Sequence, residues 1–257
     1  MPDPLHLVKV PLRAEKMIAV ARARGLPVRE IDEGYLAHVV LRGLWQDKAP
    51  SPFVIRGSGR TLEAWGYGRS DAAALIDHAA AFGDPSLVVA VGEILSIASK
   101  SMPRFERGRH LGFVLRACPV VRLAGAKNGH RAGAEVDAFL ARCFAVGKQT
   151  AVSREEVYRE WLAKTMSRPA VTGVSVTRVS VAGLSRERLV RRTHEESRSA
   201  HRLERPDVRF EGEMVVEDGD RLLAYLGLGV GRHRAFGFGA LMLTPPGTAL
   251  SLAQGRC

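Results

Sequence analysis

The chain has 257 residues, enough for two small domains, and its apolar fraction of 46% and charged fraction of 25% are those of a folded protein. Its 38 lysines and arginines outnumber 27 acids and give a formal charge of +11, which favours a polyanionic partner, nucleic acid above all. Three widely spaced cysteines favour neither a disulfide framework nor a cysteine zinc site. The sequence shows no signal-peptide pattern and no run that could span a bilayer. We therefore expect a cytoplasmic protein without metal, cofactor or membrane partner.

The first half of the chain predicts a β-α-β-β-α-β order, which is typical of a ferredoxin-like fold. Apolar periodicity and turn residues predict a strand at 5–12, a helix at 32–46, a hairpin at 52–68, a helix at 70–82, and strands at 87–91 and 110–123. The acids of the 32–46 segment stand at its start, where the helix dipole favours them.

The second half predicts a similar, looser unit after a glycine-rich basic linker at 124–133. We expect helices at 134–146 and 153–165, strands at 171–184 and from 209, a turn at Asp218-Gly219, a short helix, and a final strand at 238–247. Ser153 and Glu156 form a capping box for the second of these helices. The fold class is therefore α+β with tandem ferredoxin-like domains, one over 1–125 and one over 126–257.

An arginine-rich segment, 185–209, interrupts the second unit. It has eight arginines, two histidines, five acids and few leucines, so it cannot bury much of a core. Two interpretations stay open: an element that reaches into a nucleic-acid groove, or a surface helix whose acids and arginines pair at helical spacing. The candidate RNA-binding side chains are Arg188, Arg191, Arg192, Arg198 and Arg202.

A second basic stretch, "GLGVGRHRAFGFGAL" at 227–241, is called the glycine loop below. Gly229-x-Gly231 and Gly237-x-Gly239 flank a segment that contains Arg232, His233 and Arg234. Glycines permit positive φ angles that point successive amides at an anion, so we expect a phosphate-contacting loop. It matches neither a Walker loop nor a dinucleotide fingerprint, and a plain glycine-rich turn into the last strand is the alternative.

Tyr35 and His38 lie three positions apart on the helix expected at 32–46, so they share one face. An imidazole exchanges a proton near neutral pH, as a general acid or a general base. The alternative is that His38 has no catalytic role.

These stretches together resemble the CRISPR repeat-processing endoribonucleases of the CasE kind, in the superfamily of repeat-associated proteins. Tyr35, His38 and Leu41 match a Tyr-x-x-His-x-x-Leu segment, and the four glycines with Ala240 and Leu241 match a C-terminal loop. "FVLRACP" at 113–119 and "FEG" at 210–212 match two strands, and the likeness runs from about residue 5 to 246.

The resemblance implies a metal-independent endoribonuclease that binds the hairpin of a CRISPR repeat, cuts precursor RNA once per repeat, and remains with the mature RNA in a multi-protein effector complex. His38 would assist attack of a ribose 2′-hydroxyl and leave a 2′,3′-cyclic phosphate, with the imidazole as base or acid. Tyr35 would position the His38 imidazole, and the glycine loop would hold the RNA hairpin. Arg42 would stabilise the charge of the phosphorane, a role for which Lys9 is a weaker candidate.

The segment 185–209 departs from that pattern and resembles a helical finger found in type IV CRISPR processing subunits, where arginines would replace histidine. Two further alternatives stay open. One is a non-catalytic RNA-hairpin-binding subunit of a CRISPR effector complex, and the other is an unrelated basic enzyme that binds a nucleotide cofactor at the glycine loop.

Overall fold

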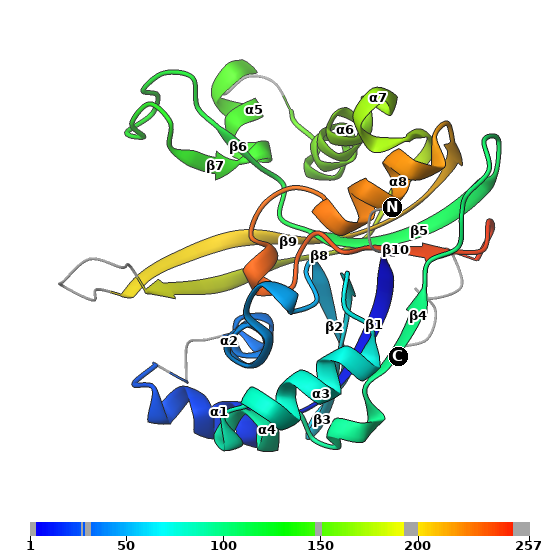
Figure 1. Ribbon diagram of the computed structural model, residues 1–257. Coiled ribbons are helices and arrows are strands. Elements are labelled where there is room, and N and C mark those ends of the chain that lie inside the picture. The colour runs from blue at the N-terminus through cyan, green and yellow to red at the C-terminus, as the bar shows by residue number, and fades with distance from the viewer. Residues whose placement is uncertain (1–3, 27, 29–31, 147–150, 193–199, 249–257) are drawn as a thin grey trace.

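The computed structural model describes residues 4–26, 28, 32–146, 151–192 and 200–248, with the backbone alone between 187 and 203. Two units, each a four-stranded antiparallel sheet with helices against it, lie one above the other in Figure 1.

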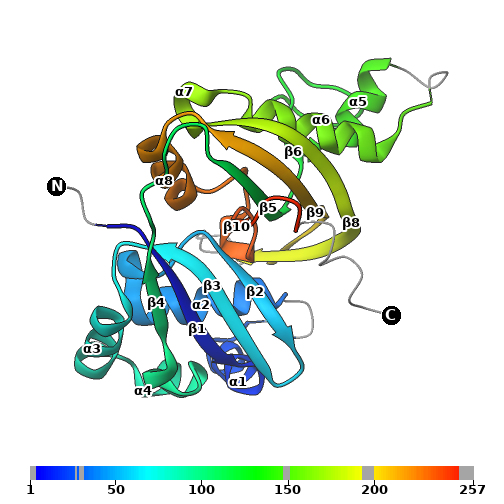
Figure 2. The same cartoon turned by 90° about the vertical axis from the view of Figure 1, so that its right-hand side faces the viewer.

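The first unit has the strand order β2-β3-β1-β4, that of a ferredoxin-like sheet. Figure 2 shows this sheet with α1 and α2 behind it. Its elements are β1 (His6–Arg13), α1 (Ala14–Ala23), α2 (Glu33–Trp45), β2 (Phe53–Ser58), β3 (Thr61–Gly68), α3 (Ala72–Phe82), α4 (Pro85–Ala90) and β4 (Ala98–Ser101), with two 3₁₀ turns, η2 (Gln46–Lys48) and η3 (Ile94–Ser96).

The second unit repeats this topology with the order β10-β5-β9-β8, so the tandem ferredoxin-like fold is confirmed. Along the chain, β6 and β7 lie between β5 and β8, and they form a small sheet of their own. Its elements are β5 (His110–Ala117), β6 (Val120–Arg122), β7 (Glu135–Asp137), α5 (Ala138–Val146), α6 (Arg154–Met166), α7 (Pro169–Thr172), β8 (Val174–Arg192), β9 (Ala200–Val216), α8 (Gly219–Leu228), η4 (Arg234–Phe236) and β10 (Leu241–Thr244).

Each unit has its own apolar core, and strand alternation explains how β1 contributes to the first one. Val8, Val10 and Leu12 are fully buried against the helices, while Lys9 between them lies on the other face. Burial of such side chains stabilises the fold by roughly 1.5–3 kcal/mol each. Lys9 therefore points away from α2, and it pairs with Glu63 at 3.6 Å.

The two units are joined through a side chain of the first that is buried in the core of the second. Tyr67 of β3 is 1% exposed, packs in the second core and donates from its hydroxyl to the Leu241 carbonyl at 2.7 Å. Burial raises the pKa of this phenol well above its usual range. The hydroxyl thus stays neutral, and its hydrogen bond ties β3 to β10.

One prediction for the first unit is wrong, and one helix was missed. The expected strand at 87–91 is helix α4, because Asp84 accepts the Ser86 amide at 2.8 Å and Pro85 opens the helix; this capping outweighs the β-branched valines. Helix α1 was not predicted. Its N-cap residue, Arg13, makes no side-chain capping bond, so the usual start signal is absent.

The assignment of 110–123 to the first unit is also wrong. The segment divides at Cys118-Pro119 into β5 and β6, and β5 pairs with β9 and β10. The fourth strand of the first sheet is β4, and the second sheet begins before residue 125.

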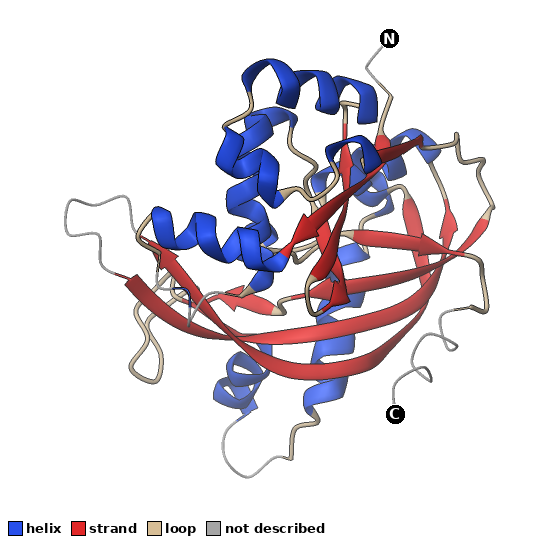
Figure 3. Cartoon of the chain, turned by 90° about the horizontal axis from the view of Figure 1, so that it is seen from below, coloured by secondary structure: helices blue, strands red, loops and turns tan. Residues whose placement is uncertain are grey.

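A helical conformation for 185–209 is wrong as well, because the described backbone there continues β8 and β9 as one long antiparallel hairpin (Figure 3). Residues pair across it from Ser185↔Asp207 to Arg192↔Ala200. Arg186 lies 3.8 Å from Glu204 on the facing strand. Glu204 is thus paired with an arginine across the strands and not along a helix, and the strand predicted up to residue 184 continues.

Candidate functional site

Helix α2 presents Tyr35, His38 and Arg42 along one side, called the α2 face. Asp32 caps the helix by accepting the Tyr35 amide at 3.0 Å, while the opposite side, including Val40 and Leu44, is buried in the first core. The Tyr35 and His38 rings are half-buried, with centroids 6.1 Å apart. The two side chains therefore lie side by side on one face of α2, as their spacing predicts.

The glycine loop lies directly against the start of α2. The Phe236 ring stacks on Tyr35 with centroids 5.1 Å apart and an interplanar angle of 22°. A methyl group on Gly34 would lie 2.2 Å from the Phe236 carbonyl oxygen, so the two backbones touch. The fold thus brings together two stretches that are some 200 residues apart.

Four of the five glycines of the loop, Gly229, Gly231, Gly237 and Gly239, have positive φ between 75° and 86°, which favours glycine. At Gly239 an added methyl would lie 2.6 Å from the Val230 carbonyl oxygen, and at Gly229 it would lie 2.8 Å from Pro52. Gly231 and Gly237 have more room, with nearest contacts of 3.1 and 3.6 Å. Packing within the protein therefore explains two of the glycines, and backbone conformation explains the other two.

The backbone amides at the tip of the loop differ from those beside them in their hydrogen bonding. Among the described residues, the backbone N–H groups of 231–235 have no hydrogen-bond acceptor, whereas those of Val230, Phe236 and Gly237 do. Gly231 and His233, both with positive φ, turn the chain within this stretch. Successive amides without acceptors are the donors that concave anion-binding sites use in proteins.

A carboxylate from the second unit holds the loop cations. Glu135 accepts from His233 Nε2 at 2.5 Å, and its other oxygen lies 3.4 Å from Arg232 Nη1. The His233 hydrogen bond, more than the Arg205 and Arg232 charges, lowers the pKa of Glu135. Arg234 instead donates to the Leu228 carbonyl. Glu135 thus faces two arginines, Arg205 at 3.8 Å and Arg232 at 3.4 Å.

Arg42, one turn after His38, is exposed and donates to the Gln46 carbonyl. It lines a cleft of about 590 Å³ between the units, together with Lys48, Arg69 and Gly227. Burial, and secondly the Arg42 charge, lower the pKa of His38 below 6.5. His38 is therefore mostly neutral at pH 7 and able to accept a proton.

Arg116, in the stretch "FVLRACP", was not predicted as a site residue. Its guanidinium forms a bidentate pair with Asp207, at 3.0 and 2.9 Å, donates to the Phe236 carbonyl at 3.4 Å and lies over the Phe238 ring at 4.4 Å. It thus ties β5 and β9 to the glycine loop. Its motif was visible in the sequence, but its partners lie 91 and 120 residues away.

The predicted arginines of the hairpin are placed in backbone only. Arg188, Arg191 and Arg192 belong to β8 and Arg202 to β9, with side chains outside the described part, and Arg198 lies outside the described residues altogether. Within the described residues no group of three or more histidines, cysteines and acids is arranged to hold a metal ion. None of the helices in the described ranges has the length and apolar character needed to cross a bilayer.

Comparison with known proteins gives a family and a fold. A family model described as "CRISPR associated protein" matches residues 5–245, and no curated protein matches. The fold is similar to that of CRISPR endoribonuclease Cse3 bound to a 19 nt RNA, at 21% identity and a TM-score of 0.58 over 94% of this chain and 100% of the other.

Two further solved structures are similar. Thermus thermophilus Cse3, bound to an RNA representing a pre-cleavage complex, has 19% identity and a TM-score of 0.53 over 94% of this chain and 100% of that one. A chain of a CRISPR RNA-guided surveillance complex has 17% identity and a TM-score of 0.51 over 93% and 99%. At these identities the likeness establishes the fold.

Proposed function

The chain belongs to the family of CRISPR-associated proteins, and from that premise we propose that it binds the hairpin of a CRISPR repeat, cleaves the precursor RNA without a metal ion, and remains with the mature RNA in an effector complex. The observation that carries the proposal is the docking of the glycine loop on the α2 face. Phe236 stacks on Tyr35, and Tyr35 lies beside the His38 ring, so this stack links the loop to a mostly neutral imidazole.

The binding surface consists of the glycine loop and the β8–β9 hairpin. In the loop, amides 231–235 would hold one phosphate, and Arg232 and Arg234 would add charge. The hairpin is a two-stranded ribbon that extends beyond the sheet (Figure 1). Its arginines, Arg188, Arg191, Arg192, Arg198 and Arg202, would contact phosphates and 2′-hydroxyls along the wide minor groove of the stem.

The chemistry uses a nucleophile that belongs to the RNA. His38 Nδ1 or Nε2 takes the proton of the ribose 2′-hydroxyl, the 2′-oxygen bonds to phosphorus, and the bond from phosphorus to the 5′-oxygen breaks. A proton then reaches the 5′-oxygen, and the products are a 2′,3′-cyclic phosphate and a 5′-hydroxyl. The lowered pKa of His38 supports the base role. Tyr35 orients the imidazole, and Arg42 stabilises the phosphorane charge from the cleft side.

The experiment that tests this proposal is cleavage of the repeat RNA encoded beside the gene, in the presence of EDTA. Cleavage that survives the chelator and is lost in His38→Ala supports His38 as the base, provided that the variant still binds the hairpin. Unchanged cleavage by His38→Ala would mean that arginines, and not His38, catalyse the reaction. Tight binding without cleavage by the wild-type protein would instead support a non-catalytic subunit.

A further inference from the structure

A cavity of about 450 Å³ lies where the edge strands of the two sheets approach each other; we call it the edge cavity. Strand β4 is an edge of the first sheet and β10 an edge of the second. The apolar lining includes Leu7, Met102, Pro103, Phe105, Leu243 and Pro245. In Figure 1, β4 and β10 lie on the right of the molecule, whereas α2 and the glycine loop lie on the left. The edge cavity is therefore separate from the proposed RNA site.

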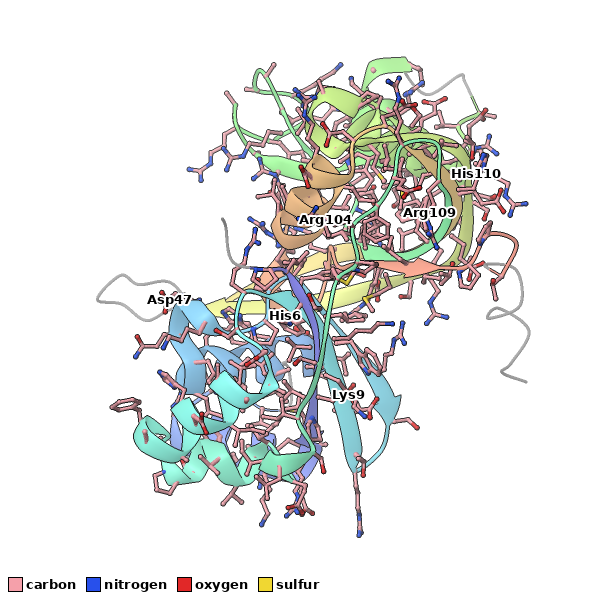
Figure 4. The ribbon with its side chains drawn as sticks, turned by 45° about the vertical axis from the view of Figure 1, so that its right-hand side comes forward. His6, Lys9, Asp47, Arg104, Arg109 and His110 are labelled. Carbon is pink, nitrogen blue, oxygen red and sulfur yellow. The ribbon has the colours of Figure 1, made fainter. Side chains whose placement is uncertain are left out.

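The edge cavity has a cationic rim. Lys100, Arg109 and His110 line it, and none of them has an ion-pair partner among the described residues. The connection between β4 and β5, residues 102–109, contains three arginines and one glutamate. Arg107 is paired with Glu217 at 3.6 Å, while Arg104 and Arg109 have no acidic partner in the described part of the chain. Figure 4 shows Arg104, Arg109 and His110 on this side of the molecule.

The lining determines which class of anion fits. Nucleobases bind single-strand sites by stacking on aromatic faces. Here the walls are mainly leucine, methionine and proline; Tyr67 is 1% exposed, which leaves Phe105 and the His110 imidazole as the accessible rings. Aliphatic walls accept an aliphatic or aromatic side chain of a protein, and methionine adapts to its shape. The unpaired cations then favour acids on either side of that side chain.

We propose that the edge cavity is a docking site for a segment of a partner protein, in which one apolar anchor residue is flanked by acids. The apolar side chain fills the cavity between β4 and β10, and the flanking carboxylates pair with Lys100, Arg109 and His110. This site is accessible while RNA occupies the opposite side, and it does not depend on RNA cleavage.

The test is selection of a phage-displayed library of random dodecapeptides on the full-length protein. We expect selected peptides to share a Leu, Ile, Met or Phe flanked by Asp or Glu. Their binding, measured by fluorescence anisotropy of synthetic peptides, should weaken about tenfold or more in Lys100→Glu/Arg109→Glu. Serine in place of the apolar anchor should weaken it similarly. The matched control, Arg60→Glu/Arg131→Glu, reverses as many exposed charges elsewhere and should bind like the wild type.

Three outcomes would overturn the proposal. The selected peptides could share no motif, or they could bind Lys100→Glu/Arg109→Glu as tightly as the wild type. In the third outcome, single-stranded oligouridylate displaces the peptide from the wild-type protein, and its own binding requires Lys100 and Arg109. The last would assign the edge cavity to nucleic acid. Cleavage of repeat RNA by Lys100→Glu/Arg109→Glu should remain at the wild-type rate, so failure of the docking site and failure of the endoribonuclease function are measured separately.

Discussion

The Phe236 ring stacks on Tyr35, with 5.1 Å between the centroids. This pair connects the glycine loop to the helix that carries His38. Phe236 is 5% exposed and packs with Cys118, Val120 and Phe238 in a small third core. The position of the loop relative to the imidazole therefore depends on a few apolar contacts.

Phe236→Ala should reduce cleavage of the bound repeat RNA by about ten- to a hundredfold, because a misplacement of about 1 Å costs that much. Truncation of a buried phenylalanine also costs about 3–5 kcal/mol of unfolding free energy. Single-turnover cleavage with saturating protein, together with urea unfolding, separates the two effects. Phe236→Leu keeps the apolar volume and serves as control. A full cleavage rate in a folded Phe236→Ala protein would mean that the stack does not position the site.

The pKa of His38 gives a pH prediction. Because burial and the Arg42 charge lower it below 6.5, cleavage by a base should rise with pH through that lowered value and then level off. Arg42→Gln removes the cation and should move the inflection upward. NMR titration of the His38 imidazole measures the same shift without RNA. If Arg42→Gln leaves the titration where it was, Arg42 does not act on His38 through its charge.

The same group links stability to pH. The folded-state pKa of His38 lies below the unfolded value of 6.5, so the unfolded chain binds the proton first. Its contribution to stability is present above pH 6.5 and is lost as the pH falls toward the folded pKa. We expect this part of the pH dependence to disappear in His38→Gln, as measured by urea midpoints between pH 5 and 8.

Removal of charges in and beside the glycine loop should change the salt dependence of RNA binding. Arg232→Ala/Arg234→Ala should weaken binding and flatten the plot of log Kd against log salt by about 1–2 units. Glu135→Gln should act in the opposite direction, because it removes the carboxylate that pairs with Arg232 and His233. Filter binding at several salt concentrations measures both slopes. Identical slopes in all three proteins would exclude the loop from the RNA interface.

Two glycines of the loop should respond differently to substitution. Gly239→Ala places a methyl 2.6 Å from a backbone carbonyl at φ +86°, so it should destabilise the fold by about 2 kcal/mol or more. Gly231→Val has its nearest contact at 3.1 Å, on the Trp161 ring. It should cost about 1–2 kcal/mol of backbone strain and impair hairpin binding. Thermal melts and affinities for the RNA hairpin measure both effects in the two variants. If Gly231→Val binds RNA normally, Gly231 serves only the turn of the backbone and does not contact RNA.

Local signals determined much of the fold before the structure was known. Asp32 before a 3.6-residue period predicted α2, alternation predicted β8, and the glycine pattern predicted a turn with positive φ. These features depend on neighbours within one or two turns of the chain, so propensity and capping suffice. They also predicted that Tyr35 and His38 share one face.

Tertiary structure decided the rest, because the interactions that settle it join distant residues. Strand β5 joined the second sheet through its pairing with β9, about a hundred residues later, and the segment 185–209 pairs with itself as an extension of β8 and β9. Glu135 holds His233 across 98 positions, and Phe236 contacts Tyr35 across some 200 positions. Closing such long loops costs chain entropy that only the assembled cores offset, and a pattern read along the chain does not contain those cores.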